Sequence, residues 1–112
     1  MKISGSLKEK LIQHIASSDL PFFSTEFFPP QTVEGIKNVI SRIENVKEGN
    51  PMFCDITWHG TGNPEGKGNT SSLSIAEMAL NICGLETMSH ITCVSVNKQE
   101  LDAYLKKLKQ VG

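Results

Sequence analysis

The chain has 112 residues, which is about the length of one ordinary domain. Its 11 basic and 12 acidic residues leave a formal net charge of -1, so the composition gives no indication of binding to nucleic acid or to an anionic membrane surface. The apolar runs are short and interrupted by charges, which excludes a predicted transmembrane helix or signal peptide, and we expect a cytoplasmic protein.

One helix and one strand are predicted in the first 30 residues. Residues 4–17 have the spacing of an amphipathic leader helix with Ser4 or Ser6 as its cap, and its apolar face carries Leu7, Leu11, Ile12 and Ile15. The β-prone run 22–27 follows and ends at two prolines, which cannot continue a strand ladder.

The middle of the chain predicts a second helix, a second strand and a long loop. Thr32 can cap a helix over residues 33–47, which Gly49-Asn50-Pro51 then ends. Residues 52–58 form the second strand. Residues 60–69 contain four glycines and a proline, and a loop of this length can lie over a ligand.

The last third predicts a third helix that opens at Ser71 or Ser72 and closes at Gly84, followed by a strand over 87–94. The run Asn97 to Glu100 has the pattern of a capping box, so a final helix begins there. Strands that alternate with helices predict an α/β fold with a parallel sheet and right-handed crossovers.

The cysteines are interpreted as small apolar residues. Cys54, Cys83 and Cys93 are odd in number, and no pair has C-x-x-C spacing. Three reduced thiols are therefore favoured over a disulfide or a structural zinc site.

Polar side chains recur at the carboxyl ends of the three predicted strands. Glu26 and Thr57 are 31 residues apart, and Thr57 and His90 are 33 apart, each about the length of one strand–helix unit. Because side chains alternate along a strand, these three share one face, together with Asp55, while the opposite face is mostly apolar. We therefore expect an acid, a hydroxyl and an imidazole to meet at one mouth of the sheet.

This arrangement is typical of the inner face of a (β/α)8 barrel, where strand ends form the active-site rim. A whole barrel needs about 250 residues. The fold class we predict is therefore α/β, namely the first three strand–helix units of a (β/α)8 TIM barrel preceded by an N-terminal helix. A small open α/β sheet is the alternative, disfavoured because it leaves two unpaired edges and one polar face uncovered.

Glu26 is the candidate acid of this mouth. Phe23, Phe27 and Phe28 flank it, and we expect these rings to exclude water from the carboxyl group and so favour its protonated form. A solvated glutamate at a strand end is the alternative interpretation.

Four motifs together resemble methylenetetrahydrofolate reductase, from about residue 20 to the end. They are Ser24-Thr25-Glu26-Phe27-Phe28-Pro29-Pro30, Asp55-Ile56-Thr57-Trp58-His59, Cys83-Gly84-Leu85-Glu86-Thr87 and His90-Ile91-Thr92-Cys93. The resemblance implies the N-terminal portion of a catalytic barrel over residues 21–112, and the helix predicted from the spacing makes residues 1–20 a separate leader. The resemblance also implies a homo-oligomer for the full-length protein.

The resemblance further implies a flavoprotein of one-carbon and methionine metabolism. FAD would take a hydride from NADH or NADPH and pass it to 5,10-methylenetetrahydrofolate, giving 5-methyltetrahydrofolate. Glu26 would be the general acid, Thr57 and Trp58 would contact the flavin or nicotinamide, and His90 would hydrogen-bond the flavin. Nicotinamide-nucleotide contacts would run along Glu26, Phe27, Phe28, Pro29, Pro30 and Gln31.

Two departures and four alternative interpretations accompany this resemblance. Gln31 stands where many relatives carry a basic residue, which puts a charge contact with a nucleotide phosphate there in doubt. The flavin-binding aspartate after a fourth strand has no counterpart, so we expect a fragment, and a truncated non-catalytic product is one alternative. A barrel hydrolase with a metal on Glu26, Asp55 and His90 is another, disfavoured without an H-x-H pair; we assign no metal ligands. Asp55 could equally be structural, and Trp58 could simply pack beneath a helix.

Overall fold

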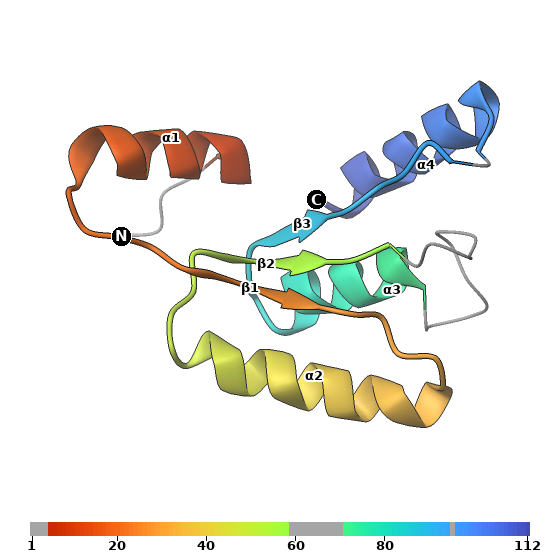
Figure 1. The fold of residues 1–112 in the computed structure, drawn as a ribbon, viewed down its shortest axis with the longest axis horizontal. Coiled ribbons are helices and arrows are strands. Elements are labelled where there is room, and N and C mark those ends of the chain that lie inside the picture. The colour runs from red at the N-terminus through yellow and green to blue at the C-terminus, as the bar shows by residue number, and fades with distance from the viewer. Residues whose placement is uncertain (1–4, 59–70, 95) are drawn as a thin grey trace.

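The computed structural model describes residues 5–58, 71–94 and 96–112 and shows helices alternating with strands (Figure 1). The three strands form one parallel sheet in the order β1-β2-β3, which confirms the predicted α/β class and chain order. The elements are α1 (Leu7–Ser17), β1 (Ser24–Phe27), α2 (Val33–Lys47), β2 (Phe53–Ile56), α3 (Ser72–Glu77), the π-helical turn η2 (Met78–Ile82), β3 (Thr87–Ser89) and α4 (Lys98–Val111).

All three strands are shorter than predicted, and the last by the largest margin. The strand expected over residues 87–94 ends at Ser89, which lies opposite Ile56, the last residue of β2. A strand exists only where a neighbour supplies hydrogen bonds, and β3 has β2 on one side only. The β-prone residues beyond His90 therefore lack a ladder partner within this sheet.

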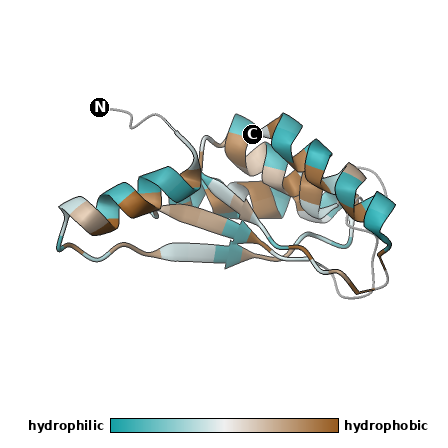
Figure 2. Ribbon diagram, turned by 90° about the horizontal axis from the view of Figure 1, so that it is seen from above, coloured by the Kyte–Doolittle hydropathy of each residue, from teal (hydrophilic) through white to brown (hydrophobic). Residues whose placement is uncertain are grey.

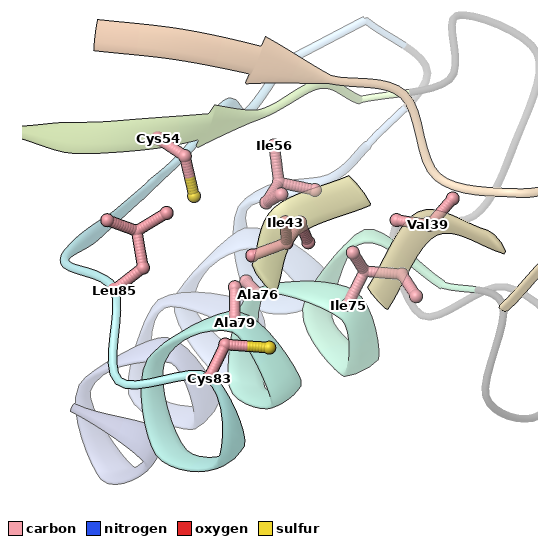
Figure 3. Packing of buried hydrophobic residues seen from close by; sticks show 9 residues of the cluster. All are labelled: Val39, Ile43, Cys54, Ile56, Ile75, Ala76, Ala79, Cys83 and Leu85. Atoms are coloured by element: carbon pink, nitrogen blue, oxygen red, sulfur yellow. The ribbon is translucent and has the colours of Figure 1, made fainter. Parts of the chain in front are cut away.

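The core lies on one face of the sheet, between β2 and the two helices that follow β1 and β2. Figure 3 shows Cys54 and Ile56 pointing from β2 toward Ile43 of α2 and Ala79 of η2. Ile43, Ile56 and Ile75 are 0% exposed. Burying one such aliphatic side chain contributes about 1.5–3 kcal/mol. The alternation read from the sequence is thus confirmed, with the apolar face of β2 under the helices.

The helix boundaries follow the predicted caps closely. Thr32 caps α2 by accepting the Gly35 N–H, and Ser71 caps α3 by accepting the Ser74 N–H. Asn97 and Glu100 form the predicted capping box of α4. Asn50, in the turn that follows α2, has a left-handed φ of 57°, a conformation that asparagine tolerates better than most residues.

Two features of the helices differ from the prediction. The third helix becomes π-helical over η2, and it ends before Gly84, which has a left-handed φ of 71°. A single π-helical turn does not produce a recognisable periodicity in the sequence, so it could not be predicted. The leader helix has no fully buried residue, and its predicted apolar face is only partly covered: Leu7 and Leu11 are half-buried, whereas Ile12 and Ile15 are 57% and 69% exposed. Figure 2 shows α1 extending beyond the end of the sheet, with hydrophobic and hydrophilic positions alternating along its ribbon. Lys10, paired with Glu86, joins α1 to the segment before β3.

The three cysteines are free thiols, as predicted, but they do not share one environment. Cys54 and Cys83 are buried in the core, whereas Cys93 is exposed because β3 ends before reaching it. The interpretation of Cys93 as a small apolar core residue is therefore wrong. Each helix in the described ranges is too short or too polar to cross a lipid bilayer.

Candidate active site

Three side chains from three strands meet at the carboxyl edge of the sheet, on the face opposite the core. Glu26 of β1 lies directly beside Asp55 of β2 in the parallel register. His90 follows β3, and its backbone N–H donates to the carbonyl of Ile56 at 2.9 Å, which holds it against β2. Because backbone ladders fix all three positions, the side chains are held on rigid elements of the fold.

The histidine ring lies between the two carboxylates. His90 Nδ1 is 3.6 Å from Glu26 Oε1, and His90 Nε2 is 3.6 Å from Asp55 Oδ2. Both distances are within ion-pair range but longer than a direct hydrogen bond of about 2.7–3.2 Å. The predicted approach of Glu26 and His90 at one mouth is confirmed as geometry.

The predicted aromatic environment of Glu26 is wrong. The Glu26 side chain is 52% exposed, so its carboxyl group meets water. Phe27 points to the opposite face, where it packs against the core, and Phe23 and Phe28 are themselves 50% and 71% exposed. Neighbours along a strand alternate faces and therefore cannot enclose the side chain between them. The phenylalanine rings therefore do not shield the Glu26 carboxyl group from water.

Thr57 follows β2 and is enclosed on its backbone side. Its N–H donates to the Phe27 carbonyl at 3.0 Å, and its own carbonyl accepts the Ser72 hydroxyl at 2.7 Å. Thr57 is 6% exposed, and within the described residues its Oγ1 has no hydrogen-bond partner. An unpaired buried hydroxyl costs about 1–3 kcal/mol. A ligand acceptor could satisfy this hydroxyl, because within the described residues the Thr57 side chain makes no hydrogen bond to Glu26 or His90.

Trp58 packs under the last helix. Its ring meets that of Tyr104 edge-on, with centroids 5.3 Å apart and planes at 82°. Tyr104 is 2% exposed, so this pair attaches α4 to the end of β2. Of the two interpretations of Trp58, the structure shows packing beneath a helix. His59 and the glycine-rich loop that follows it lie outside the described residues.

The motif after Glu26 leaves the sheet along the start of α2. Pro29 is buried, while Phe28 and Gln31 are exposed. The Pro30 ring sits so close to α2 that a β-carbon at Gly35 would lie 2.9 Å from Pro30 Cβ, nearer than side chains pack. Glycine at 35 therefore lets the proline segment lie against the helix start, with Phe28 and Gln31 facing outward.

Asp55 is the residue whose importance the sequence left open. Its Oδ2 faces His90, its side chain is 21% exposed, and its buried Oδ1 has no partner among the residues described. The signal was available, since strand parity put Asp55 on the face of Glu26 and His90. Sequence alone could not show that the ring lies equally far from both acids.

Comparison with known proteins extends across nearly the whole chain. A family model described as methylenetetrahydrofolate reductase matches residues 10–112. The chain belongs to the methylenetetrahydrofolate reductase family. Every candidate residue, from Glu26 to His90, lies inside the matched region.

Named relatives in animals, plants and bacteria agree with this family. A Caenorhabditis elegans protein named "Probable methylenetetrahydrofolate reductase (NADPH)" is 40% identical over 107 residues, 95% of this chain and 16% of the relative. An Oryza sativa protein named "Probable methylenetetrahydrofolate reductase (NADH)" is 38% identical over 103 residues, 90% of this chain and 16% of the relative. A Buchnera aphidicola protein named "5,10-methylenetetrahydrofolate reductase" is 32% identical over 99 residues, 88% of this chain and 32% of the relative. The chain thus spans only a small part of the length of these relatives.

Proposed function

We propose that this chain carries the acid end of a flavin-dependent site that reduces 5,10-methylenetetrahydrofolate to 5-methyltetrahydrofolate with NAD(P)H. Family membership supports the reaction class. The observation that carries the proposal is the meeting of the Glu26 carboxyl with the His90 ring at the carboxyl edge of a parallel sheet. In the complete protein this sheet would form the first three strands of a (β/α)8 barrel, whose active site lies at that edge.

Glu26 has the exposure that proton transfer to a substrate requires. Its side chain is 52% exposed at the sheet edge, so a substrate nitrogen can reach the carboxyl oxygen directly. The proton leaves Glu26 and forms an N–H bond on the folate nitrogen that departs when the one-carbon bridge opens. General acid catalysis of this kind typically contributes about 10²–10⁴-fold in rate.

The residues around Glu26 fit a flavin. FAD supplies hydride chemistry when bound. His90 is 40% exposed and can donate to a ring heteroatom, and the unpaired Thr57 hydroxyl is a buried polar group that a ligand acceptor would satisfy. Trp58 would help through its packing on Tyr104, which fixes the end of β2. These residues would bind and orient the flavin.

The proposed coenzyme class follows from membership of the methylenetetrahydrofolate reductase family. Relatives are named for NADPH in one case and NADH in another, so we propose NAD(P)H without a preference between them. The outward-facing Phe28 and Gln31, on the segment from Glu26 to Gln31, would supply nicotinamide-nucleotide contacts. Gln31 is uncharged, so such a contact would be a hydrogen bond rather than an ion pair with phosphate.

The first experiment measures flavin binding by the 112-residue chain. The purified chain is mixed with excess FAD, separated from free FAD and examined for flavin absorbance. Near-stoichiometric flavin supports the proposal. Absence of flavin overturns it for this chain and supports the alternative of a non-catalytic product of the same family.

The second experiment separates the role of Glu26 from flavin binding. Glu26→Gln should retain FAD and NAD(P)H-dependent flavin reduction within a few-fold, but lose about 10²–10⁴-fold in 5-methyltetrahydrofolate formation. Glu48→Gln is the matched control, because Glu48 is an exposed glutamate that follows α2. Equal losses in both half-reactions would show that Glu26 is not the acid.

A metal-dependent hydrolase is the second candidate, and one observation favours it. Ligand atoms of Glu26, Asp55 and His90 all lie within 4.8 Å of one another, so a single divalent cation could bridge them. Metal analysis of protein purified without chelator decides the point. A stoichiometric metal that survives dialysis would support the hydrolase, and its absence together with bound flavin would remove it.

A further inference from the structure

The position of Asp55 gives it a function that the motif residues do not provide. We propose that Asp55 is a positioning residue that holds the proton of neutral His90 on Nε2, so that Nδ1 is left to share a proton with Glu26. The inference rests on the proposed function for its catalytic meaning, but its geometry and its test do not need flavin or folate.

The two carboxylates compete for one ring proton. A neutral imidazole has one N–H donor and one acceptor nitrogen, whereas an ionised carboxylate only accepts. Within the described ranges, Glu26 of β1 and Asp55 of β2 are the charged groups at ion-pair distance from His90. Both lie at 3.6 Å from their ring nitrogen, so distance does not decide which of them receives the N–H.

Burial decides the competition in favour of Asp55. The Asp55 side chain is 21% exposed and that of Glu26 is 52% exposed. Attraction between a carboxylate and an N–H is less screened where water is excluded. Asp55 Oδ1 is buried without a partner among the described atoms, which leaves Oδ2 as the oxygen through which this acid can be stabilised. The N–H therefore belongs on Nε2, facing Asp55.

A proton on Nε2 changes what Glu26 meets. The Nδ1 lone pair then faces Glu26 Oε1, and an ionised Glu26 would place two acceptors against each other. The contact becomes favourable when one proton lies between them, either on the Glu26 oxygen or on Nδ1. Asp55 thus acts on Glu26 through the ring, in the way that an acid behind a catalytic histidine fixes its tautomer.

This arrangement directs the Nδ1 lone pair of His90 toward Glu26, so that the two groups can share a proton that Glu26 passes to the substrate. In the reaction, the Glu26 O–H bond breaks and an N–H bond forms on the substrate nitrogen, leaving Glu26 as a carboxylate; water then returns the proton to the Glu26–His90 pair. No oxidant or reductant takes part in this transfer. The 3.6 Å separations are longer than direct hydrogen bonds, and catalytic hydrogen bonds commonly tighten when substrate binds.

The test reads the tautomer of His90 directly by ¹⁵N-histidine NMR on the 112-residue chain, without flavin, with a chelator present and at a pH where imidazoles are neutral. The signal is assigned by its loss in His90→Gln. We expect the Nε2–H form to dominate in the wild-type chain. A dominant Nδ1–H form would overturn the inference without any further variant.

Substitution of Asp55 gives the second measurement. Asp55→Asn removes the charged acceptor and should move the ratio of Nδ1–H to Nε2–H at least about tenfold toward Nδ1–H, the size expected when a charge-assisted hydrogen bond is lost. Asp55→Glu keeps the charge and should keep Nε2–H. Asp102→Asn is the matched control, because Asp102 is an exposed acid paired with Lys98, and should change nothing.

If Asp55→Asn does not fold, a third measurement still tests the inference. Glu26→Gln weakens the competing acceptor on the Nδ1 side and should raise the share of Nε2–H. An unchanged ratio in Asp55→Asn, or a fall of Nε2–H in Glu26→Gln, contradicts the inference. Because none of these measurements uses flavin or turnover, a failure of the proposed function would be seen separately, in the FAD-binding experiment.

Discussion

Thr57, which follows β2, and Ser72, the first residue of α3, have buried hydroxyls whose removal should change the stability of the chain in opposite directions. Thr57 Oγ1 is buried with no partner among the described residues, and Thr57→Val replaces that hydroxyl with a methyl group of similar size. The unpaired hydroxyl costs about 1–3 kcal/mol, so its removal should raise the free energy of unfolding by that amount. Ser72 instead donates its hydroxyl to the Thr57 carbonyl at 2.7 Å. Ser72→Ala leaves that carbonyl without this donor and should lower the free energy of unfolding by about 1–3 kcal/mol.

The assay is urea unfolding of the wild-type chain and both variants. The free energy of unfolding falls by about 2 kcal/mol per molar urea. The unfolding midpoint of Thr57→Val should therefore lie about 0.5–1.5 M above that of the wild type, and the midpoint of Ser72→Ala about 0.5–1.5 M below it. The affinity for FAD tests whether the Thr57 hydroxyl takes part in flavin binding. If Thr57 donates to the flavin, Thr57→Val should weaken FAD binding by about 2–10-fold while it stabilises the fold.

Either of two results would refute this reasoning. Thr57→Val that destabilises the chain would mean that the hydroxyl already has a partner in the folded state. Thr57→Val that stabilises the chain with unchanged FAD affinity would leave the hydroxyl as a structural cost, with no part in flavin binding. Ser72→Ala is the control for whether this region is sensitive to mutation at all. An unchanged free energy of unfolding in Ser72→Ala would show that the end of β2 is not tightly packed.

Three further predictions concern the core and the thiols. Ile43→Ala, at a side chain with 0% exposure, should lower the free energy of unfolding by about 2–5 kcal/mol, whereas Ile82→Ala, at 71% exposure, should change it by less than about 0.5 kcal/mol; urea unfolding checks both. Burial raises the pKa of the Cys54 thiol above its ordinary 9.0, so this thiol stays protonated in the folded chain at pH values where it ionises in the unfolded chain. Stability should therefore be full below that value and fall as the pH rises through the folded pKa, and Cys54→Ala should flatten this alkaline fall in the urea midpoint. Cys93, which is exposed, should react with a thiol reagent in the native chain, while buried Cys83 reacts only on unfolding; a Cys83 as fast as Cys93 would contradict this packing.

Local chemistry made the helices predictable. Thr32, Ser71 and Asn97 each cap a helix at the position that the sequence indicated, because an N-cap needs only a side-chain oxygen and the residues just after it. The strand faces were equally readable, since alternation alone places Ile56 in the core and Asp55 on the other side.

Features that depend on distant neighbours could not be read in this way. The early end of β3 is set by where β2 ends, not by the β-prone residues that follow Ser89. The exposure of Ile15 depends on whether another element covers α1, and an amphipathic pattern cannot report that. The prediction from Phe23, Phe27 and Phe28 fails for a related reason, because residues that are neighbours of Glu26 along the chain point away from its side chain.

The link between this fold and its proposed chemistry is the register of β2. Cys54 and Ile56 are both 0% exposed under the helices, and this burial forces Asp55, which lies between them, to the opposite face. The same register puts Asp55 beside Glu26, and the Ile56 carbonyl holds the backbone of His90. A shift of one residue would put Asp55 into the core and an apolar side chain beside the ring, so it would destroy the packing and the site together. The apolar face of β2 therefore determines on which side of the sheet the acid–imidazole–acid cluster lies.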